Sequence, residues 1–265
     1  MRILVCIKQV PDTTTVEVDE KTGVLKRDGV ESKMNPFDLY AIEQALQLKG
    51  KQGGSVDVIT MGPDQAAAVL KEAIYMGADR GILISDRAFA GADVVATSYT
   101  LSQGIHKAGE YDLILCGKQT TDGDTAQVGP ETAEFLGIEH VTNVERIEDV
   151  VGQELTVIEN QESCYRKLRL HMPCLLTMEK DVNTPRLASY KRKLTLMDLK
   201  TEVISLADFE DKDPKHYGLA GSPTQVERIF PPEKNVSRQL FEGDRETLAE
   251  GIYDVLAQRK LIGEN

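Results

Sequence analysis

A polar loop between an apolar strand and a helix carries the residues best suited to chemistry in this sequence. Positions 117 to 137 read GKQTTDGDTAQVGPETAEFLG, after the apolar run Leu113–Cys116 and around a helix opened by Pro130. At the end of a buried strand, free backbone N–H groups and the positive end of the next helix can bind a phosphate. Asp122 and Asp124 would repel a bare phosphate, so we expect them to accept hydrogen bonds from ribose hydroxyls, an amide or neighbouring backbone. The loop therefore predicts a nucleotide site that is not a P-loop.

Motifs for catalysis by side chains are missing from the sequence. It contains no GxSxG, no HExxH, no Walker GxxxxGK[ST], and no GxGxxG after the first strand. The four histidines have no neighbour at metal-ligand spacing, and the four cysteines form no CxxC pair and are expected to be reduced, buried thiols. We therefore predict no catalytic residue and no metal ligand, and expect a bound cofactor or a partner to do the chemistry.

Apolar strands alternate with amphipathic helices over the first 140 residues, a pattern typical of βαβ units. It predicts an α/β fold with a mostly parallel sheet and helices on both faces. The expected strands are Ile3–Ile7, Val56–Thr60, Ile82–Ile84 and Leu113–Cys116, and the expected helices are Pro36–Lys49, Asp64–Met76, Asp93–Lys107 and one opened by Pro130. Ligands of such sheets bind outside the carboxyl ends of the strands, where the strand order reverses.

Three of these strands end in turns that we expect to line one crevice, namely Cys6–Lys8, Met61–Gly62 and Gly117–Lys118. A further segment, Asn35–Asp38, has the residue types of a helix start, with the asparagine as N-cap and the following proline at the first helical position. Capping alone explains this pattern without a ligand. Both interpretations of the segment stay open.

The rest of the chain departs from the alternation. Extended segments at 155–159, 167–171 and 175–178 predict antiparallel strands that complete the sheet, and a small hairpin is expected over 16–26. The segment 183–200 holds the densest basic cluster, Lys191–Lys193, and predicts either a solvated loop or an arm that docks on a partner. A final amphipathic helix over about 244–261 is expected to reach another subunit or to fold back onto the sheet.

Composition excludes several classes of partner. The chain has 265 residues, a formal net charge of -12 and a pI near 4.9, which argues against nucleic acid and against an anionic membrane surface. No apolar run approaches the roughly 18 residues needed to span a bilayer, and the N-terminal MRILVCIKQV enters a strand pattern directly. We expect a soluble, cytoplasmic protein without membrane insertion.

Seven short motifs are spread along nearly the whole chain. They are VCIKQVPDT at 5–13, MNPFD at 34–38, TMGP at 60–63, MGADRGI at 76–82, DGDTAQVGP at 122–130, MPCLLT at 172–177 and NTPR at 183–186. In this order they resemble the motifs of the beta (small) subunit of electron-transfer flavoproteins. The resemblance implies a Rossmann-like fold that binds an adenine nucleotide. It also implies pairing with a larger alpha subunit that holds a flavin of its own.

The same resemblance implies which segments hold the nucleotide: the main chain near the end of the first strand, the helix start after it, the turn after the second strand, and the polar loop. The residues implied are Cys6, Asn35, Pro36, Phe37, Asp38, Met61, Gln119, Thr120, Asp122, Gly123, Asp124, Thr125, Ala126, Gln127, Val128 and Gly129.

Two branches of that family differ in the nucleotide. The simple carriers hold a structural AMP, whereas the electron-bifurcating members hold an FAD that accepts hydride from NADH. The loop DGDTAQVGP resembles the bifurcating branch. Gly123 in place of an acidic residue leaves room and removes a negative charge near the phosphates, while Thr125 and Gln127 can hydrogen-bond flavin or pyrophosphate. The resemblance therefore favours FAD, with NAD as electron donor, over AMP.

Partners and a division of the chain are implied as well. The partners are the alpha subunit, a flavin-dependent dehydrogenase of the acyl-CoA, enoyl-CoA or hydroxy-acid type, and ferredoxin. We predict a nucleotide-binding domain over 1–182, an arm over 183–205 whose Leu187 and Tyr190 contact the partner, and an extension over 206–265 whose terminal helix packs on the partner subunit. A stress-type nucleotide sensor on the same sheet is the alternative from another class.

Overall fold

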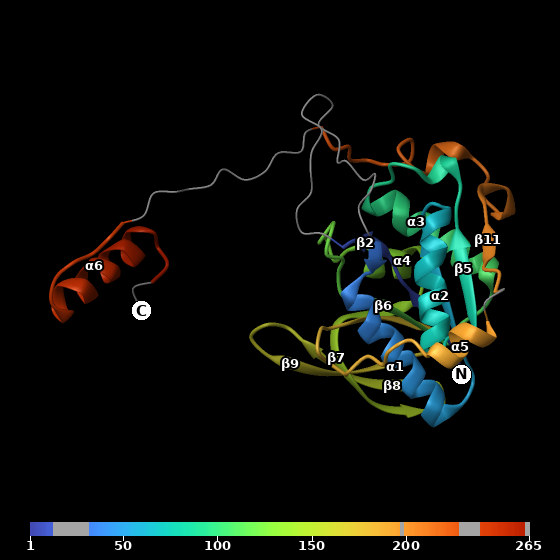
Figure 1. The fold of residues 1–265 in the computed structure, drawn as a ribbon, viewed down its shortest axis with the longest axis horizontal. Coiled ribbons are helices and arrows are strands. Elements are labelled where there is room, and N and C mark those ends of the chain that lie inside the picture. The colour runs from blue at the N-terminus through green and yellow to red at the C-terminus, as the bar shows by residue number, and fades with distance from the viewer. Residues whose placement is uncertain (13–31, 197–198, 228–238, 263–265) are drawn as a thin grey trace. The chain divides into compact units, whose positions relative to one another are not determined.

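The computed structural model describes residues 1–12, 32–196, 199–227 and 239–262 (Figure 1). The chain forms two compact units, Met1–Glu227 and Arg228–Asn265. The hairpin expected over 16–26 lies outside the described residues. The functional division at residues 182 and 205 stays a prediction, while residues 183–227 all belong to the first unit.

A nine-stranded sheet forms the centre of the first unit and confirms the α/β fold class. Its strand order is β11-β5-β4-β1-β6-β10-β7-β8-β9. In this order, each strand from β11 to β7 is parallel to its neighbours within that range. Strands β8 and β9 then extend the sheet, with β8 antiparallel to β7 and β9 antiparallel to β8. The strands are β1 (Arg2–Cys6), β4 (Ser55–Met61), β5 (Arg80–Ile84), β6 (Leu113–Gly117), β7 (Glu139–Val151), β8 (Glu154–Asn160), β9 (Tyr165–His171), β10 (Cys174–Met178) and β11 (Glu202–Ile204), with a separate antiparallel pair β2 (Gln9–Pro11) and β3 (Ser32–Met34).

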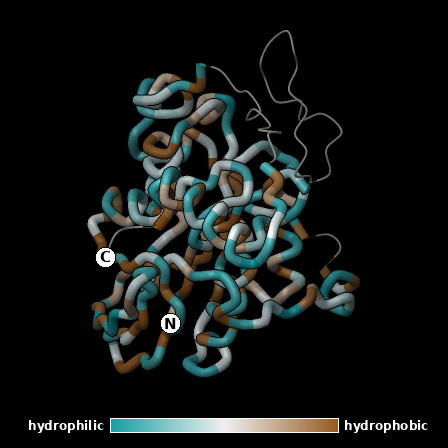
Figure 2. Tube along the Cα trace, turned by 90° about the vertical axis from the view of Figure 1, so that its left-hand side faces the viewer, coloured by the Kyte–Doolittle hydropathy of each residue, from teal (hydrophilic) through white to brown (hydrophobic). Residues whose placement is uncertain are grey.

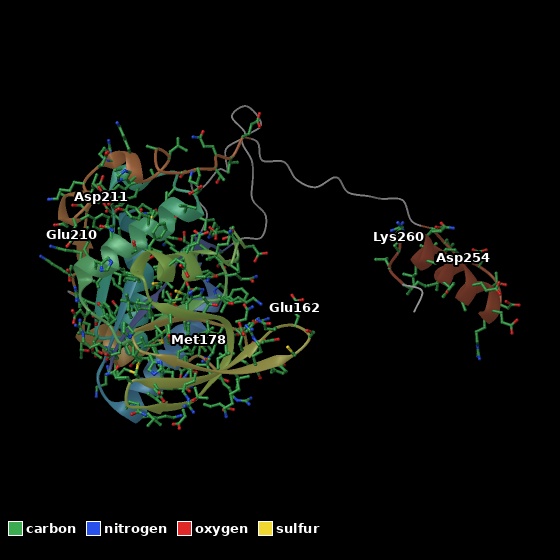
Figure 3. All side chains as sticks on the ribbon, turned by 180° about the vertical axis from the view of Figure 1, so that it is seen from behind. Glu162, Met178, Glu210, Asp211, Asp254 and Lys260 are labelled. Atoms are coloured by element: carbon green, nitrogen blue, oxygen red, sulfur yellow. The ribbon has the colours of Figure 1, made fainter. Side chains whose placement is uncertain are left out.

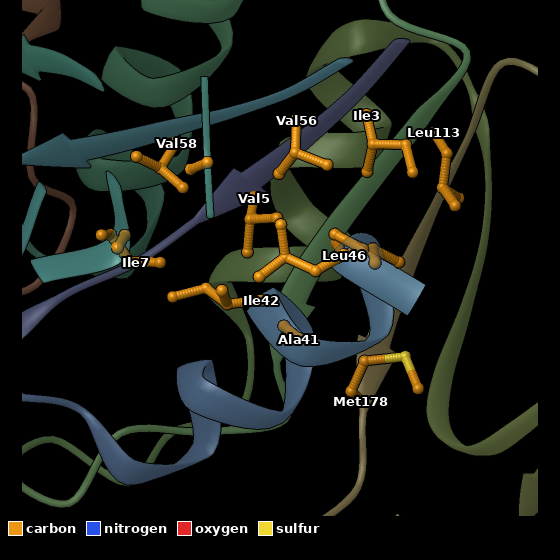
Figure 4. Close-up of a cluster of buried hydrophobic side chains, with 14 of the residues drawn as sticks. Ile3, Val5, Ile7, Ala41, Ile42, Leu46, Val56, Val58, Leu113 and Met178 are labelled. Atoms are coloured by element: carbon orange, nitrogen blue, oxygen red, sulfur yellow. The ribbon is translucent and has the colours of Figure 1, made fainter. Parts of the chain in front are cut away.

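Helices cover both faces of the sheet, as predicted. They are α1 (Pro36–Gln52) and α2 (Ala67–Met76) on one face, and α3 (Val94–Ala108) and α4 (Val128–Leu136) on the other. Because successive strand residues point to opposite faces, Ile3 and Val5 pack against the first pair of helices, while Leu4 and Cys6 pack against the second. Figure 4 shows the first of these contacts, where Ile42 of α1 meets the strand side chains. Brown, apolar stretches run through the interior in Figure 2.

One strand differs from the sequence prediction. We expected three added antiparallel strands, and this is wrong for 175–178, because β10 is parallel to both β6 and β7. The long strand β7, which we did not predict, starts the antiparallel meander with β8 and β9, and the chain then returns to insert β10 between β6 and β7. Every residue of β10 is buried, as expected for a central strand covered on both faces.

Three local details also differ. Helix α4 begins at Val128, two residues before the expected start at Pro130. A short helix, α5 (Tyr190–Thr195), and the edge strand β11 form within the segment predicted as an irregular arm. Both lie on the first unit, since β11 pairs in parallel with β5 and α5 packs beside α2.

The second unit contains the predicted terminal helix, α6 (Arg245–Gln258), with Asp244 as N-cap. The Asp244 carboxylate accepts a hydrogen bond from the Thr247 N–H at 3.0 Å, which satisfies one of the free amides of the first turn. Ile252 and Tyr253 are exposed on this helix. Figure 3 shows Asp254 on α6 and Lys260 just after its end; in the first unit it shows Glu162 at the tip of the β8–β9 hairpin.

Candidate functional site

The carboxyl ends of β1, β4 and β6 lie side by side, because β1 pairs in parallel with both of its neighbours. The chain runs from β1 to β4 and β5 on one side and then crosses to β6 on the other, so the strand order reverses at β1. In open α/β sheets, such a reversal is where ligands bind. The predicted turns after Cys6, Met61 and Gly117 are therefore brought together. We call these turns, the start of α1 and the loop 118–127 the switch-point site.

Asn35 joins three segments of this site. It is fully buried at the N-cap position of α1, its N–H donates to the Lys8 carbonyl at 2.9 Å, and its Nδ2 donates to the Gln119 carbonyl at 2.9 Å and to Asp38 Oδ1 at 2.9 Å. Asn35 takes the N-cap position as predicted, but its side chain makes no capping hydrogen bond. The Asn35 amide instead holds the polar loop against the helix start through its hydrogen bond to Gln119. Helix capping alone therefore does not explain the residue types of Asn35–Asp38.

Asp38 is the second buried polar residue at this helix start. It is 4% exposed, and its Oδ2 accepts the Lys8 N–H at 2.7 Å. Burial raises its pKa from 3.8 to about 7, although the hydrogen bonds from Asn35 and from the backbone of Lys8, together with the nearby backbone of Gly117, oppose the rise. The end of β6 also lies very close to the start of α1. A Cβ added to Gly117 would lie 2.7 Å from the carbonyl carbon of Phe37 and would contact the Asp38 carboxylate.

The polar loop is held by its own acidic residues. Both carboxylate oxygens of Asp122 accept hydrogen bonds from Lys8 Nζ at 2.8 Å, and Gln119 Nε2 donates to the Asp124 carboxylate. Burial acts to raise the pKa of Asp122, but the Lys8 ammonium outweighs it and holds that pKa below its usual range. Asp124 and Ala126 both adopt left-handed backbone conformations, with φ of 53° and 55°. Such conformations are uncommon for residues with a Cβ and mark a conformation imposed by the surroundings.

The loop leads into an uncapped helix start. Gln127 occupies the N-cap of α4 without a side-chain hydrogen bond to the helix. Within the described residues, the amides from Thr125 to Gly129 donate no hydrogen bond to another protein group. Free amides at a helix N-terminus, with the partial positive charge of the helix dipole, are suited to an anion. Gly129 allows this helix start to approach β10, because a Cβ there would lie 2.6 Å from Thr177 Cγ2.

Two buried side-chain oxygens at the switch-point site lack a hydrogen-bond partner within the described part of the chain. Among the described residues, Asn35 Oδ1 and Thr60 Oγ1 are buried without a hydrogen-bond partner, and Thr60 lies next to last in β4. An unpaired buried acceptor costs roughly 1–3 kcal/mol, so a ligand that donates to it would gain that amount. A nucleotide fits both features, since it supplies anionic phosphates for the α4 amides and hydrogen-bonding groups for the buried oxygens.

Sequence reasoning placed Lys8 in a turn of this site without giving it a role, and it missed Thr60. Lys8 directly follows the first apolar strand and is the cation that pairs with the loop, so its position at a strand end was the available signal. Thr60 is a fully buried polar side chain one residue before the end of β4, so its position beside a strand end was the available signal. Thr125 and Gln127, which we expected to contact the cofactor, are exposed. Among the described residues, neither side chain has a hydrogen-bond partner.

The predicted arm is anchored to the first unit while its apolar side chains stand free. Arg186 forms a two-pronged ion pair with the buried Glu43 of α1, at 2.7 and 3.0 Å, and Arg192 donates to the carbonyls of Ile74 and Ala78 at the end of α2. Between these anchors Leu187 is 92% exposed, and Tyr190 is 72% exposed. A segment that is anchored on both sides and presents exposed apolar side chains is suited to docking.

The Glu43–Arg186 pair provides a test of how the arm is held. Replacing Glu43 with glutamine removes the charge that Arg186 contacts. We expect the free energy of unfolding to fall by only about 1 kcal/mol, because the Arg186 side chain is half-exposed and water screens the pair. Trypsin should then cleave the basic segment 186–193 faster than in the parent chain. Lys49→Met, which breaks the exposed Lys49–Asp79 pair, is the control and should leave the cleavage rate unchanged. Equal cleavage of the Glu43→Gln and parent chains would show that the pair does not hold the arm.

None of the described helices is long and apolar enough to cross a membrane. The family model for the electron transfer flavoprotein domain matches residues 22–204. Over 99% of this chain and 100% of each relative, the sequence is 47% identical to the electron transfer flavoprotein subunit beta of Clostridium acetobutylicum and 43% identical to that of Thermoanaerobacterium thermosaccharolyticum. It is 45% identical to the caffeyl-CoA reductase-Etf complex subunit CarD of Acetobacterium woodii, again over 99% of this chain and 100% of the relative.

These similarities agree with the geometry at the switch point, where a parallel α/β sheet presents an uncapped helix start and buried polar atoms that no described residue pairs with. The matched region contains the polar loop and the anchored arm together. The chain therefore belongs to the electron transfer flavoprotein family, in which it corresponds to the beta subunit.

Proposed function

We propose that this beta subunit holds FAD at the switch-point site, receives electrons there from NADH, and passes them separately to ferredoxin and to the alpha subunit's FAD. As a beta subunit it pairs with an alpha subunit and serves a dehydrogenase. Its family membership removes the stress-type sensor that the sequence left open. The observation that carries the proposal is the uncapped start of α4, whose amides from Thr125 to Gly129 have no partner among the described residues.

Further support for a nucleotide at this site comes from charge and space along the loop. Asp122 is neutralised by Lys8, so it does not repel the phosphates as strongly as a free carboxylate would. Gly123 has open space around it, since a Cβ there would meet Thr120 Oγ1 at 3.5 Å and no closer atom. The relative from Acetobacterium woodii is named for a reductase–Etf complex, which fits a subunit that works with a CoA-ester dehydrogenase.

The chain's own part is binding and electrostatics. We propose that the amides of 125–129 hold the phosphates, and that Asn35 Oδ1 and Thr60 Oγ1 accept hydrogen bonds from the nucleotide. The backbone around Cys6 and Met61, together with Pro36 and Phe37 at the start of α1, provides the wall beside the strand ends. When bound, FAD supplies hydride acceptance from NADH and release of the electrons one at a time.

Two other parts of the chain are proposed to meet partners. Leu187 and Tyr190 on the anchored arm would contact the dehydrogenase, of acyl-CoA, enoyl-CoA or hydroxy-acid type, because they are exposed and apolar on a fixed backbone. The terminal helix α6 would pack on the alpha subunit, because Ile252 and Tyr253 are exposed within the described part of its unit. A structural AMP at the switch-point site, with no NADH chemistry, is the alternative that the same geometry allows.

Counting the bound nucleotides tests this proposal. The complex purified with its alpha subunit is expected to release two FAD molecules per heterodimer on denaturation, measured by chromatography and absorbance, and NADH is expected to bleach the flavin absorbance under anaerobic conditions. One FAD plus one AMP, without bleaching by NADH, would contradict the proposal and leave the AMP alternative.

A further inference from the structure

Asp38 is a buried carboxylate whose two oxygens face two different segments of the switch-point site. Oδ2 accepts the backbone N–H of Lys8 at 2.7 Å, at the end of β1, and Oδ1 accepts Asn35 Nδ2 at 2.9 Å, at the start of α1. The same Nδ2 donates to the Gln119 carbonyl at 2.9 Å. One carboxylate therefore links the strand end and the helix start, and through Asn35 it also links the polar loop.

The ionisation of this carboxylate changes within the physiological range. Burial raises the pKa of Asp38 to about 7. The charged and titratable groups around it are the Lys8 ammonium, the Asp122 carboxylate and the thiols of Cys6 and Cys116. Lys8 holds the pKa of Asp122 below its usual range against the effect of burial, while the hydrogen bond with Cys6 and burial raise the pKa of the Cys116 thiol. Asp122 and Cys116 therefore titrate outside the range between pH 6 and 8.

Protonation of Asp38 weakens one of its links. An ionised carboxylate only accepts hydrogen bonds, so both of its oxygens are available to N–H donors. In the acid form, the proton lies on Oδ1 or Oδ2, and each of these oxygens already accepts an N–H. The protonated oxygen keeps only part of its acceptor capacity and loses its negative charge, so either the Lys8 link or the Asn35 link is weakened.

We propose that Asp38 is a positioning residue that makes nucleotide binding depend on its own ionisation: the carboxylate holds the strand end, helix start and polar loop in the binding arrangement, and the acid form binds an adenine nucleotide weakly. This inference rests on the proposed nucleotide site. It does not depend on whether the natural occupant is FAD or AMP, because the AMP moiety is common to both.

The test uses AMP and the heterodimer depleted of nucleotide, studied by isothermal titration calorimetry. Affinity for AMP is expected to fall about tenfold from pH 8 to pH 6, because the ionised fraction of a group with a pKa near 7 falls from about nine tenths to about one tenth. At pH 7, binding should release about half a proton, detected by comparing buffers that differ in ionisation enthalpy. With a purely structural role for Asp38, the proton release at pH 7 would be only the smaller fraction that comes from the AMP phosphate, which titrates near pH 6.

Asp38→Asn separates this effect from titration of the AMP phosphate near pH 6. The amide keeps the shape of the side chain but offers one acceptor and one donor, so it imitates the acid form. The variant is expected to bind weakly at every pH and to lack the part of the proton release that comes from Asp38. Asp57→Asn is the matched control, because Asp57 is also buried, accepts the Tyr111 hydroxyl at 2.9 Å and lies near the opposite end of β4. It should keep the parent pH profile.

Three results would overturn the inference. An affinity that rises on acidification would mean that repulsion between the carboxylate and the phosphates outweighs the weakened link. Identical pH profiles for the Asp38→Asn and parent complexes would show that another group titrates. If the Asp38→Asn variant fails to fold, the test rests on the protons that the parent complex releases on binding AMP at pH 7. A release well below half a proton would reject the role of Asp38. Absence of AMP binding at every pH would instead reject the proposed nucleotide site itself.

Discussion

Replacing Gly117 with alanine is expected to remove most of the bound nucleotide and to lower the free energy of unfolding by about 3 kcal/mol. The added Cβ would lie 2.7 Å from the carbonyl carbon of Phe37 and against the Asp38 carboxylate. The Phe37 atom belongs to the backbone of α1 and cannot rotate away, so either the end of β6 or the start of α1 must move. Urea unfolding of the full chain and nucleotide release from the purified heterodimer measure the two effects.

Gly50→Ala is the matched control for Gly117→Ala. Gly50 lies in the exposed last part of α1, and a Cβ there would meet no atom within 4 Å. This substitution should stabilise the helix by up to about 1 kcal/mol and leave the nucleotide content unchanged. If Gly117→Ala behaved like Gly50→Ala, the close approach of β6 to α1 would not matter for the site.

Stability should fall as pH rises through 7 because of Asp38. Its pKa is raised from 3.8 to about 7 in the folded chain, so the folded state binds this proton more tightly than the unfolded state does. The resulting stabilisation is complete below about pH 4 and is lost as the pH rises through 7. At about 1.36 kcal/mol per pKa unit, the loss between pH 5 and pH 8 is about 3 kcal/mol. Urea unfolding of the nucleotide-free chain at several pH values measures it.

Asp38→Asn should flatten this part of the pH dependence, because the amide does not titrate. The difference in unfolding free energy between the Asp38→Asn and parent chains should therefore change by about 3 kcal/mol between pH 5 and pH 8. A constant difference across that range would show that Asp38 is not the titrating group. Together with the proposed role in binding, this describes a residue kept ionised for its links at a cost in stability.

Most elements of the first unit were predictable, because their signals are local. The apolar runs at β1, β4, β5 and β6 and the periodic segments at α1, α2 and α3 each identify an element within a few residues. The proline after Asn35 gave the start of α1, and the alternation of strands and helices gave the parallel sheet. The prediction was wrong where pairing joins distant segments, as in β10, whose direction depends on its neighbours β6 and β7.

The contacts of the switch-point site were less predictable than its location. The polar loop and the strand ends were identified from their composition, and the topology confirms that those strand ends meet at one edge. The use of each polar group was not predictable, since Asp122 pairs with Lys8, 114 positions away, and the Asn35 amide bonds the Gln119 carbonyl instead of capping its helix. Such choices depend on which donors lie within about 3 Å after folding.

The amino-acid sequence by itself determined the fold class, the order of the first strands and helices, the polar loop and the family, because hydrophobic periodicity and motif order are properties of neighbouring residues. Only the tertiary structure decided that β10 lies between β6 and β7, that Arg186 anchors the arm on Glu43, and that Asp38 is buried between two N–H donors. Burial and long-range pairing exist only after the chain has collapsed, and they set the charge state of Asp38.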